Sequence, residues 1–207
     1  IQGSTLEYNV AQGYGGGLYN TRDLYMRTTT VRDGKAVRGG GVANSNTVIG
    51  QAVFESTTVS GNTATETGGG IYSEGMLALL DTTLQNNQAK SGGGLHNLDA
   101  LTIQGSLIKG NIASSLTLGE GLGGGILNIS PKPANISQTA IGGNQAEYGG
   151  GIYQYGNYTM TLSYSTVHDN QAASDGGGIY NNSIFIIWNS TFSGNLAGVD
   201  GGGLVNL

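Results

Sequence analysis

The stretch GGGIYNNSIFIIWNSTFSGNLA, residues 176–197, contains the two motifs that decide the fold. It opens with three glycines and Ile179, and it continues to Phe192-Ser193-Gly194-Asn195 with an alanine two positions later. The glycine triplet occurs eight times in the chain, starting at residues 15, 39, 68, 92, 123, 149, 176 and 201. Successive starts are separated by 24–31 residues, which indicates a repeat architecture whose units are too short to fold alone.

The second motif reads apolar-x-x-Asn-x-Ala and precedes each triplet. Its asparagines are Asn9, Asn62, Asn87, Asn111, Asn144, Asn170 and Asn195, with Gly34 at this position in the second copy. Asparagine tolerates the left-handed backbone conformation of a strand corner, and stacked asparagines can hydrogen-bond to one another. We therefore predict a structural asparagine ladder. Because Gly34 keeps the conformation and loses the side chain, we expect conformation to be the stricter demand.

Apolar residues recur at a spacing of two before each second motif, as at Phe185 and Ile187, which is strand periodicity. The sequence predicts an all-β, right-handed parallel β-helix of about eight coils with three short strands per coil, stacked about 4.8 Å apart. Differences in repeat length fall within residues 44–51, 114–122 and 129–133, where we expect loops. Residues 1–207 form one array, interpreted as a segment of a longer chain or a subunit that stacks end to end.

The composition excludes several classes of protein. Glycine supplies 39 of the 207 residues, and charged residues only 10%, against about 25% in ordinary globular domains. The absence of cysteine excludes disulfides and thiolate metal sites. A net charge of −5 disfavours nucleic acid as a partner. The chain lacks an apolar run of about 18 residues, so we expect no membrane insertion by this segment.

The two motifs at Gly176–Ile179 and Phe192–Asn195 resemble the GGAI and FxxN repeats of polymorphic outer-membrane proteins, which are autotransporter adhesins. They are also similar to repeats of bacterial surface proteins with choice-of-anchor domains. The resemblance extends over the whole chain and implies a right-handed parallel β-helix with an extracellular or cell-surface location. It implies little about the ligand, because one fold serves many functions.

Parallel β-helices also include polysaccharide-cleaving enzymes, so a pectate-lyase-like enzyme is the alternative hypothesis. Asn97-Leu98-Asp99 matches one of four polygalacturonase motifs, and the acidic residues are spread at one or two per repeat. A cluster of Asp81, Asp99 and Glu120 in space would favour an enzyme, whereas their dispersal would favour a scaffold. We predict no catalytic site, no metal site and no cofactor, and we expect His96 and His168 to be surface residues.

One column of residues faces outward and is rich in aromatic rings. It follows each triplet-apolar unit and includes Tyr19, Tyr72, His96, Tyr153 and Tyr180. An exposed aromatic stripe suits a protein interface or contact with sugar rings. The alternative is that aromatic residues favour strands and stack on one another, which requires no ligand.

Five Asn-x-Ser/Thr sequences occur, at Asn128, Asn135, Asn157, Asn181 and Asn189. The predicted register turns Asn128 and Asn181 inward, which leaves Asn135, Asn157 and Asn189 as candidate glycosylation sites. Our leading hypothesis is an extracellular structural or adhesive solenoid, or filament component, without catalytic activity. Its expected partners are other copies of itself, other surface proteins and cell-surface glycans. A glycan-binding module is a further alternative.

Overall fold

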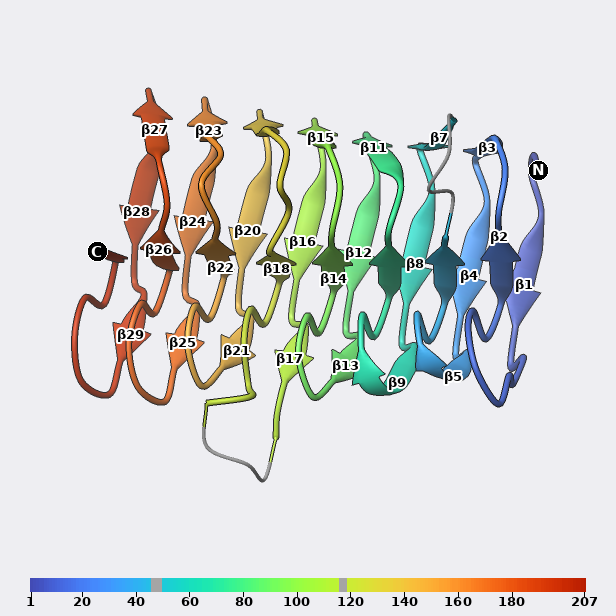
Figure 1. Cartoon of the computed structure of the whole chain (residues 1–207), viewed down its shortest axis with the longest axis horizontal. Helices are drawn as coiled ribbons and strands as arrows, with labels where there is room; N and C mark the ends of the chain where they lie inside the picture. Colours follow the sequence, from blue (N-terminus) through green and yellow to red (C-terminus); the bar gives the residue numbers. More distant parts are fainter. Residues whose placement is uncertain (46–49, 116–118) are drawn as a thin grey trace.

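The computed structural model describes residues 1–45, 50–115 and 119–207 and consists of strands stacked into a parallel solenoid (Figure 1). The strands form four parallel sheets that run the length of the stack, two of eight strands and two of seven. The N-terminus and the C-terminus lie at opposite ends of the long axis (Figure 1). Within the described ranges, no helix has the length and apolar character needed to cross a membrane.

We number the sheets in the order in which the chain passes through them within one coil, so that sheet IV holds the strand that directly follows the glycine triplet. Sheet I contains β3 (Leu24–Arg27), β7 (Gln51–Glu55), β11 (Met76–Leu80), β15 (Leu101–Gln104), β19 (Ala134–Ser137), β23 (Met160–Ser163) and β27 (Phe185–Trp188). Sheet II contains β1 (Thr5–Glu7), β4 (Thr30–Arg32), β8 (Thr58–Ser60), β12 (Thr83–Gln85), β16 (Leu107–Lys109), β20 (Ala140–Gly142), β24 (Thr166–His168) and β28 (Thr191–Ser193).

Two further sheets complete each coil. Sheet III contains β5 (Lys35–Arg38), β9 (Thr63–Thr67), β13 (Gln88–Ala89), β17 (Ile112–Ala113), β21 (Gln145–Ala146), β25 (Gln171–Ala172) and β29 (Leu196–Ala197). Sheet IV contains β2 (Leu18–Asn20), β6 (Val42–Asn44), β10 (Ile71–Ser73), β14 (Leu95–Asn97), β18 (Ile126–Asn128), β22 (Ile152–Tyr155), β26 (Ile179–Asn182) and β30 (Leu204–Asn206).

The prediction of an all-β parallel solenoid of about eight coils is confirmed, but the prediction of three strands per coil omits sheet III. Its strands shorten to two residues from β13 onward, and a pair such as Gln88–Ala89 is too short for a visible alternation. The alanine that ends every copy of the second motif was the available signal for sheet III. It faces the inside of a small lobe, and Ala64, Ala89 and Ala172 are buried there.

Along each sheet, the strand register places side chains of the same kind next to one another in successive coils. Leu77 pairs with Leu101 and Leu79 with Ile103 in sheet I, and Leu84 pairs with Ile108 in sheet II. Together with the apolar residue after each triplet, these columns form one continuous buried core. Each such side chain contributes about 1.5–3 kcal/mol when it leaves water. The core therefore grows by one layer per coil.

The predicted loop positions fall between consecutive strands of the chain, and the described strands keep their register. The loop at residues 129–133 joins β18 to β19, and the strands on either side of it keep their pairing. Parts of the other two, residues 46–49 and 116–118, lie outside the described residues. Differences in repeat length are therefore absorbed outside the paired strands.

An unbroken ladder of buried amides runs through the corner between sheets II and III. Each asparagine donates through Nδ2 to Oδ1 of its neighbour one coil further on, at distances of 2.9–3.0 Å. The members are Asn62, Asn87, Asn111, Asn144, Asn170 and Asn195. Asn9, predicted as a seventh member, lies exposed in the first coil, and Gly34 offers it no side-chain partner in the next coil.

Backbone conformation is not what selects these asparagines, which corrects our expectation. The left-handed residue is the one that precedes the ladder position, as at Asp33, Asn86 and Asp169, with φ of 53–55°. The ladder asparagines have no positive φ. At Gly34, the backbone N–H donates to Asn62 Oδ1 at 2.9 Å. A Cβ there would lie 2.4 Å from the carbonyl oxygen of Gly40, so this copy has no room for a side chain.

The glycine triplets lie directly against the ladder. In the triplet at 92–94, Gly92 has a φ of +62°, a conformation that favours glycine. A Cβ on Gly93 would lie 2.5 Å from backbone atoms of Ile112. A Cβ on Gly94 would lie 2.5 Å from the Gly125 carbonyl oxygen and 3.1 Å from the Asn111 amide. The triplet therefore divides each coil into a large apolar core and a small lobe next to sheet III.

We expect Asn111→Ala to lower the free energy of unfolding by about 3 kcal/mol, since it leaves buried donors and acceptors without partners. Asn111 Nδ2 donates to Asn144 Oδ1 at 3.0 Å and to the Leu84 carbonyl at 2.9 Å, and its Oδ1 accepts two hydrogen bonds from Asn87. Urea denaturation measures the change. The matched control is Asn9→Ala, at the same repeat position outside the ladder, with an expected change below about 0.5 kcal/mol. Equal effects would contradict the ladder's role.

A second prediction concerns the triplet. Gly94→Ala should destabilise the protein by about 1–3 kcal/mol or prevent folding, because the added methyl group overlaps backbone of the next coil. Gly13→Ala is the control, since a Cβ there meets no atom within 4 Å and the backbone has no positive φ. Thermal unfolding followed by circular dichroism distinguishes the two variants. A Gly94→Ala protein as stable as Gly13→Ala would refute the packing argument.

Candidate binding surface

The predicted aromatic stripe lies on the outward side of sheet IV, but it is not uniformly exposed. Tyr19 is 51% exposed, whereas Tyr72 is 4% and His96 7% exposed. Tyr153 and Tyr180 are half-buried. The expectation of an exposed stripe is therefore wrong at Tyr72 and His96. The reason is ring packing between coils: the centroid of Tyr14 lies 6.1 Å from that of Tyr72, and the Tyr72 ring packs on His96.

At the N-terminal end of the stripe, aromatic rings and one guanidinium form a packed cluster. The Arg38 guanidinium carbon lies 5.8 Å from the ring centroids of both Tyr14 and Tyr72, within the range of cation–π contacts. Tyr72 meets His96 edge to face, with centroids 5.4 Å apart. The Tyr72 hydroxyl donates to Glu74 Oε1 at 2.8 Å, and burial raises the pKa of this tyrosine. These contacts leave little of Tyr72 and His96 accessible to solvent or to a ligand.

His96 corrects our expectation of a surface histidine. Among the described residues, neither of its ring nitrogens has a hydrogen-bond partner. Burial, with a smaller contribution from the Arg38 charge, lowers the pKa of His96 to about 4, so the ring is neutral at pH 7. His168 differs, because it is partly exposed and its Nδ1 lies 2.8 Å from Asp169 Oδ2. The Tyr72 ring, which the sequence register placed beside His96 without revealing how closely the two pack, covers His96.

A second aromatic cluster occurs further along the same face and remains partly open to solvent. Tyr153 and Tyr180 stack in parallel, with centroids 4.9 Å apart and planes within 2° of each other. Tyr148, the residue before the triplet at 149, meets Tyr180 edge to face at 5.7 Å. Burial raises the pKa of both Tyr153 and Tyr180. The three rings support one another and hold Tyr148 in a defined orientation.

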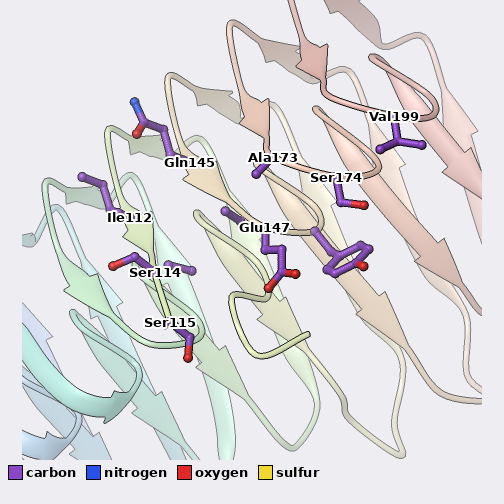
Figure 2. A pocket seen from close by; sticks show the side chains of 11 residues that line it. Ile112, Ser114, Ser115, Gln145, Glu147, Ala173, Ser174 and Val199 are labelled. Atoms are coloured by element: carbon purple, nitrogen blue, oxygen red, sulfur yellow. The ribbon is translucent and has the colours of Figure 1, made fainter. Parts of the chain in front are cut away.

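Tyr148 also lines a groove of about 600 Å³ that crosses the lobe beside β17, β21 and β25; we call it the lobe groove. Figure 2 shows the side chains of Ile112, Gln145 and Val199 spread along it, with Glu147 near its middle. The full lining is Ile112, Ala113, Ser114, Ser115, Gln145, Ala146, Glu147, Tyr148, Ala173, Ser174 and Val199. The groove and the second aromatic cluster thus form one continuous surface.

The carboxylates that would favour an enzyme lie in three different turns. Asp81 lies between β11 and β12, Asp99 between β14 and β15, and Glu120 between β17 and β18. Asp99 binds Lys132 with Nζ and Oδ2 2.7 Å apart, and Glu120 accepts a hydrogen bond from Ser115 at 3.0 Å. Across residues 1–45, 50–115 and 119–207, no three acidic or histidine residues are placed to hold a metal ion. This arrangement gives the enzyme hypothesis no support.

The candidate glycosylation sites divide by exposure. Asn135, Asn157 and Asn189 are exposed, and their glycosylation remains a prediction. Asn128 and Asn181 are buried, as the register predicted, and they belong to a second inward column of amides in sheet IV. Asn97 donates to Asn128 at 2.7 Å and Asn128 to Gln154 at 2.6 Å. The signal for this second column was the amide or hydroxyl residue that recurs two positions after the apolar residue of each triplet. We did not predict its hydrogen bonds.

We expect His96→Leu to stabilise the protein by about 1–3 kcal/mol at pH 7, because it removes two buried polar atoms without partners. The gain should grow as the pH falls. The unfolded histidine, with a pKa of about 6.5, takes up its proton before the folded one, so wild-type stability declines between pH 6.5 and pH 4, by roughly 3 kcal/mol in all. Urea denaturation at pH 7 and pH 4.5 tests this. A gain that is the same at both pH values would contradict it.

Comparison with known proteins adds one finding. Residues 56–74 and 165–182 match the family model described as Chlamydia polymorphic membrane protein repeat. Each matched segment covers three consecutive strands, β8–β10 and β24–β26, and therefore one asparagine of the ladder and one glycine triplet. The chain matches no curated protein and no solved structure. Over these two segments, the resemblance of the chain to polymorphic membrane protein repeats is confirmed.

Proposed function

We propose that this chain forms part of an extracellular, right-handed parallel β-helix that serves as a structural and adhesive element at a cell surface. The observation that carries the proposal is the family match at residues 56–74 and 165–182, because both segments occupy equivalent places in one continuous stack. The family is one of surface membrane proteins, and its repeats supply the same ladder-and-triplet unit that builds this chain.

The architecture suits that role physically. Eight coils at about 4.8 Å each give a rod whose core, from Met26 to Ile179, and amide ladder, from Asn62 to Asn195, extend over most of its length, so bending must disturb several columns at once. The lateral faces carry the variable side chains and would meet partners. We propose other copies of the chain, other surface proteins and cell-surface glycans as those partners. The supporting feature is the half-open surface formed by the lobe groove and Tyr148.

Immunolabelling of intact source cells tests the location. An antibody against residues 1–207 should label unpermeabilised cells, and brief treatment of those cells with an external protease should remove the label. An antibody against a cytoplasmic protein serves as the permeability control. Label that appears only after permeabilisation would overturn the proposal.

An activity assay tests the absence of catalysis separately. Purified protein incubated with polygalacturonate, with and without calcium, should release no unsaturated product, measured by ultraviolet absorbance, because its carboxylates are dispersed. A pectate lyase added to the same substrate is the positive control. Product formation that is lost in an Asp99→Asn variant would instead support the polysaccharide-cleaving alternative.

A further inference from the structure

The lobe groove, together with Tyr148, has the chemistry of a carbohydrate site rather than of a protein interface. We propose that it binds an uncharged oligosaccharide, with a sugar ring packed on Tyr148 and hydroxyl groups hydrogen-bonded to Gln145, Glu147 and Ser174. The proposal names a partner for the adhesive role proposed above and rests on that role for its biological meaning. The binding itself can be tested on the purified chain.

The size and shape of the groove fit such a ligand. Its volume of about 600 Å³ lies within the usual range of small-molecule sites. It extends across four successive coils, from Ile112 to Val199, so its floor repeats about every 4.8 Å. An extended glycan also repeats, sugar by sugar, and its hydroxyl groups would meet an equivalent row of side chains and backbone at each coil.

The polar groups of the groove can both donate and accept hydrogen bonds. Gln145 is exposed, and its side-chain amide forms no hydrogen bond among the described residues. Glu147 uses Oε2 to accept the Gly119 N–H at 2.8 Å, which fixes the carboxylate and leaves acceptor capacity on Oε1. Ser174 donates to Asp175 Oδ2 at 3.2 Å, so its hydroxyl oxygen can accept. Sugar hydroxyls, which donate and accept, are the matching partners.

Tyr148 supplies the apolar part of the site. Its edge-to-face contact with Tyr180, which in turn stacks on Tyr153, holds the ring before any ligand arrives. Little rotamer entropy is then lost on binding. Ring stacking of this kind suits the apolar face of a pyranose, whose C–H groups meet the negative face of the aromatic ring. The arrangement combines one aromatic platform with several flanking hydrogen-bonding groups.

Charge narrows the class of glycan. Glu147 is the one charged residue among those that line the groove, and the lining contains no lysine, arginine or histidine. Residues 39–207 carry ten acidic and three basic side chains, a net charge of −7. Sialylated, sulfated and uronic-acid glycans would place their negative charge beside this field without a cation to compensate for it. The groove therefore favours neutral sugars and disfavours anionic ones.

The test is a glycan array probed with the purified, folded chain, in which each neutral glycan is paired with its sialylated or sulfated form. We expect binding to neutral members and at least a tenfold weaker signal for their charged partners. The best neutral glycan is then titrated by calorimetry against variants. Tyr148→Ala, Glu147→Gln and the groove-filling Ala173→Phe should each weaken binding at least tenfold.

Tyr158→Ala is the matched control, because Tyr158 is an exposed tyrosine outside the groove lining, and it should bind as wild type does. Unchanged melting temperatures show that each variant is folded. Gln145→Ala, which removes an exposed amide without a partner, gives a second measurement if Tyr148→Ala fails to fold. Binding of no neutral glycan, preference for the charged forms, or equal binding by Ala173→Phe and wild type would overturn the proposal. Surface labelling of intact cells is independent of these results, so the two proposals can fail separately.

Discussion

The close contact between the third glycine of the triplet and the asparagine ladder, which occurs in six of the eight repeats, is the constraint on which the rest of the structure depends. Because the Gly94 backbone lies against the Asn111 amide, the chain crosses each coil at the same place and divides it into core and lobe. The crossing places the apolar residue after the triplet in the core and the outward residue beside the one that precedes the triplet. Core register, lobe and aromatic clusters all follow from this crossing.

Most of the fold could be predicted because repetition multiplies weak signals. A single apolar pair at a spacing of two means little, but the same pair in seven copies fixes sheets I and II and the position of the core. Sheet III was missed because a two-residue strand such as Gln145–Ala146 leaves no periodicity to detect. Two reasons were given for asparagine, and their ranking was wrong: hydrogen bonding in the dry corner selects Asn111, while the left-handed conformation falls on the preceding residue.

The candidate site was harder to predict, because it depends on residues that are distant in the repeat pattern. The period-two pattern correctly predicted that His96 and Tyr72 point away from the core. A side chain that points outward is still buried where a second segment packs against the sheet. Contacts between successive coils decide this: Arg38 and Tyr14 help to cover Tyr72, whereas near Tyr148 the surface stays open. The lobe groove arises from the shape of four successive coils, and such shape is not encoded in any one motif.

The asparagine ladder also has a direction. Each amide from Asn62 to Asn170 donates to its C-terminal neighbour, and each from Asn87 to Asn195 accepts from its N-terminal one. An additional coil before Asn62 must offer a donor, as Gly34 does, and one after Asn195 must offer an acceptor. A coil stacked on the ladder in the opposite orientation would set donor against donor or acceptor against acceptor. The ladder thus makes the solenoid a vectorial object, in which successive coils can stack in one orientation only.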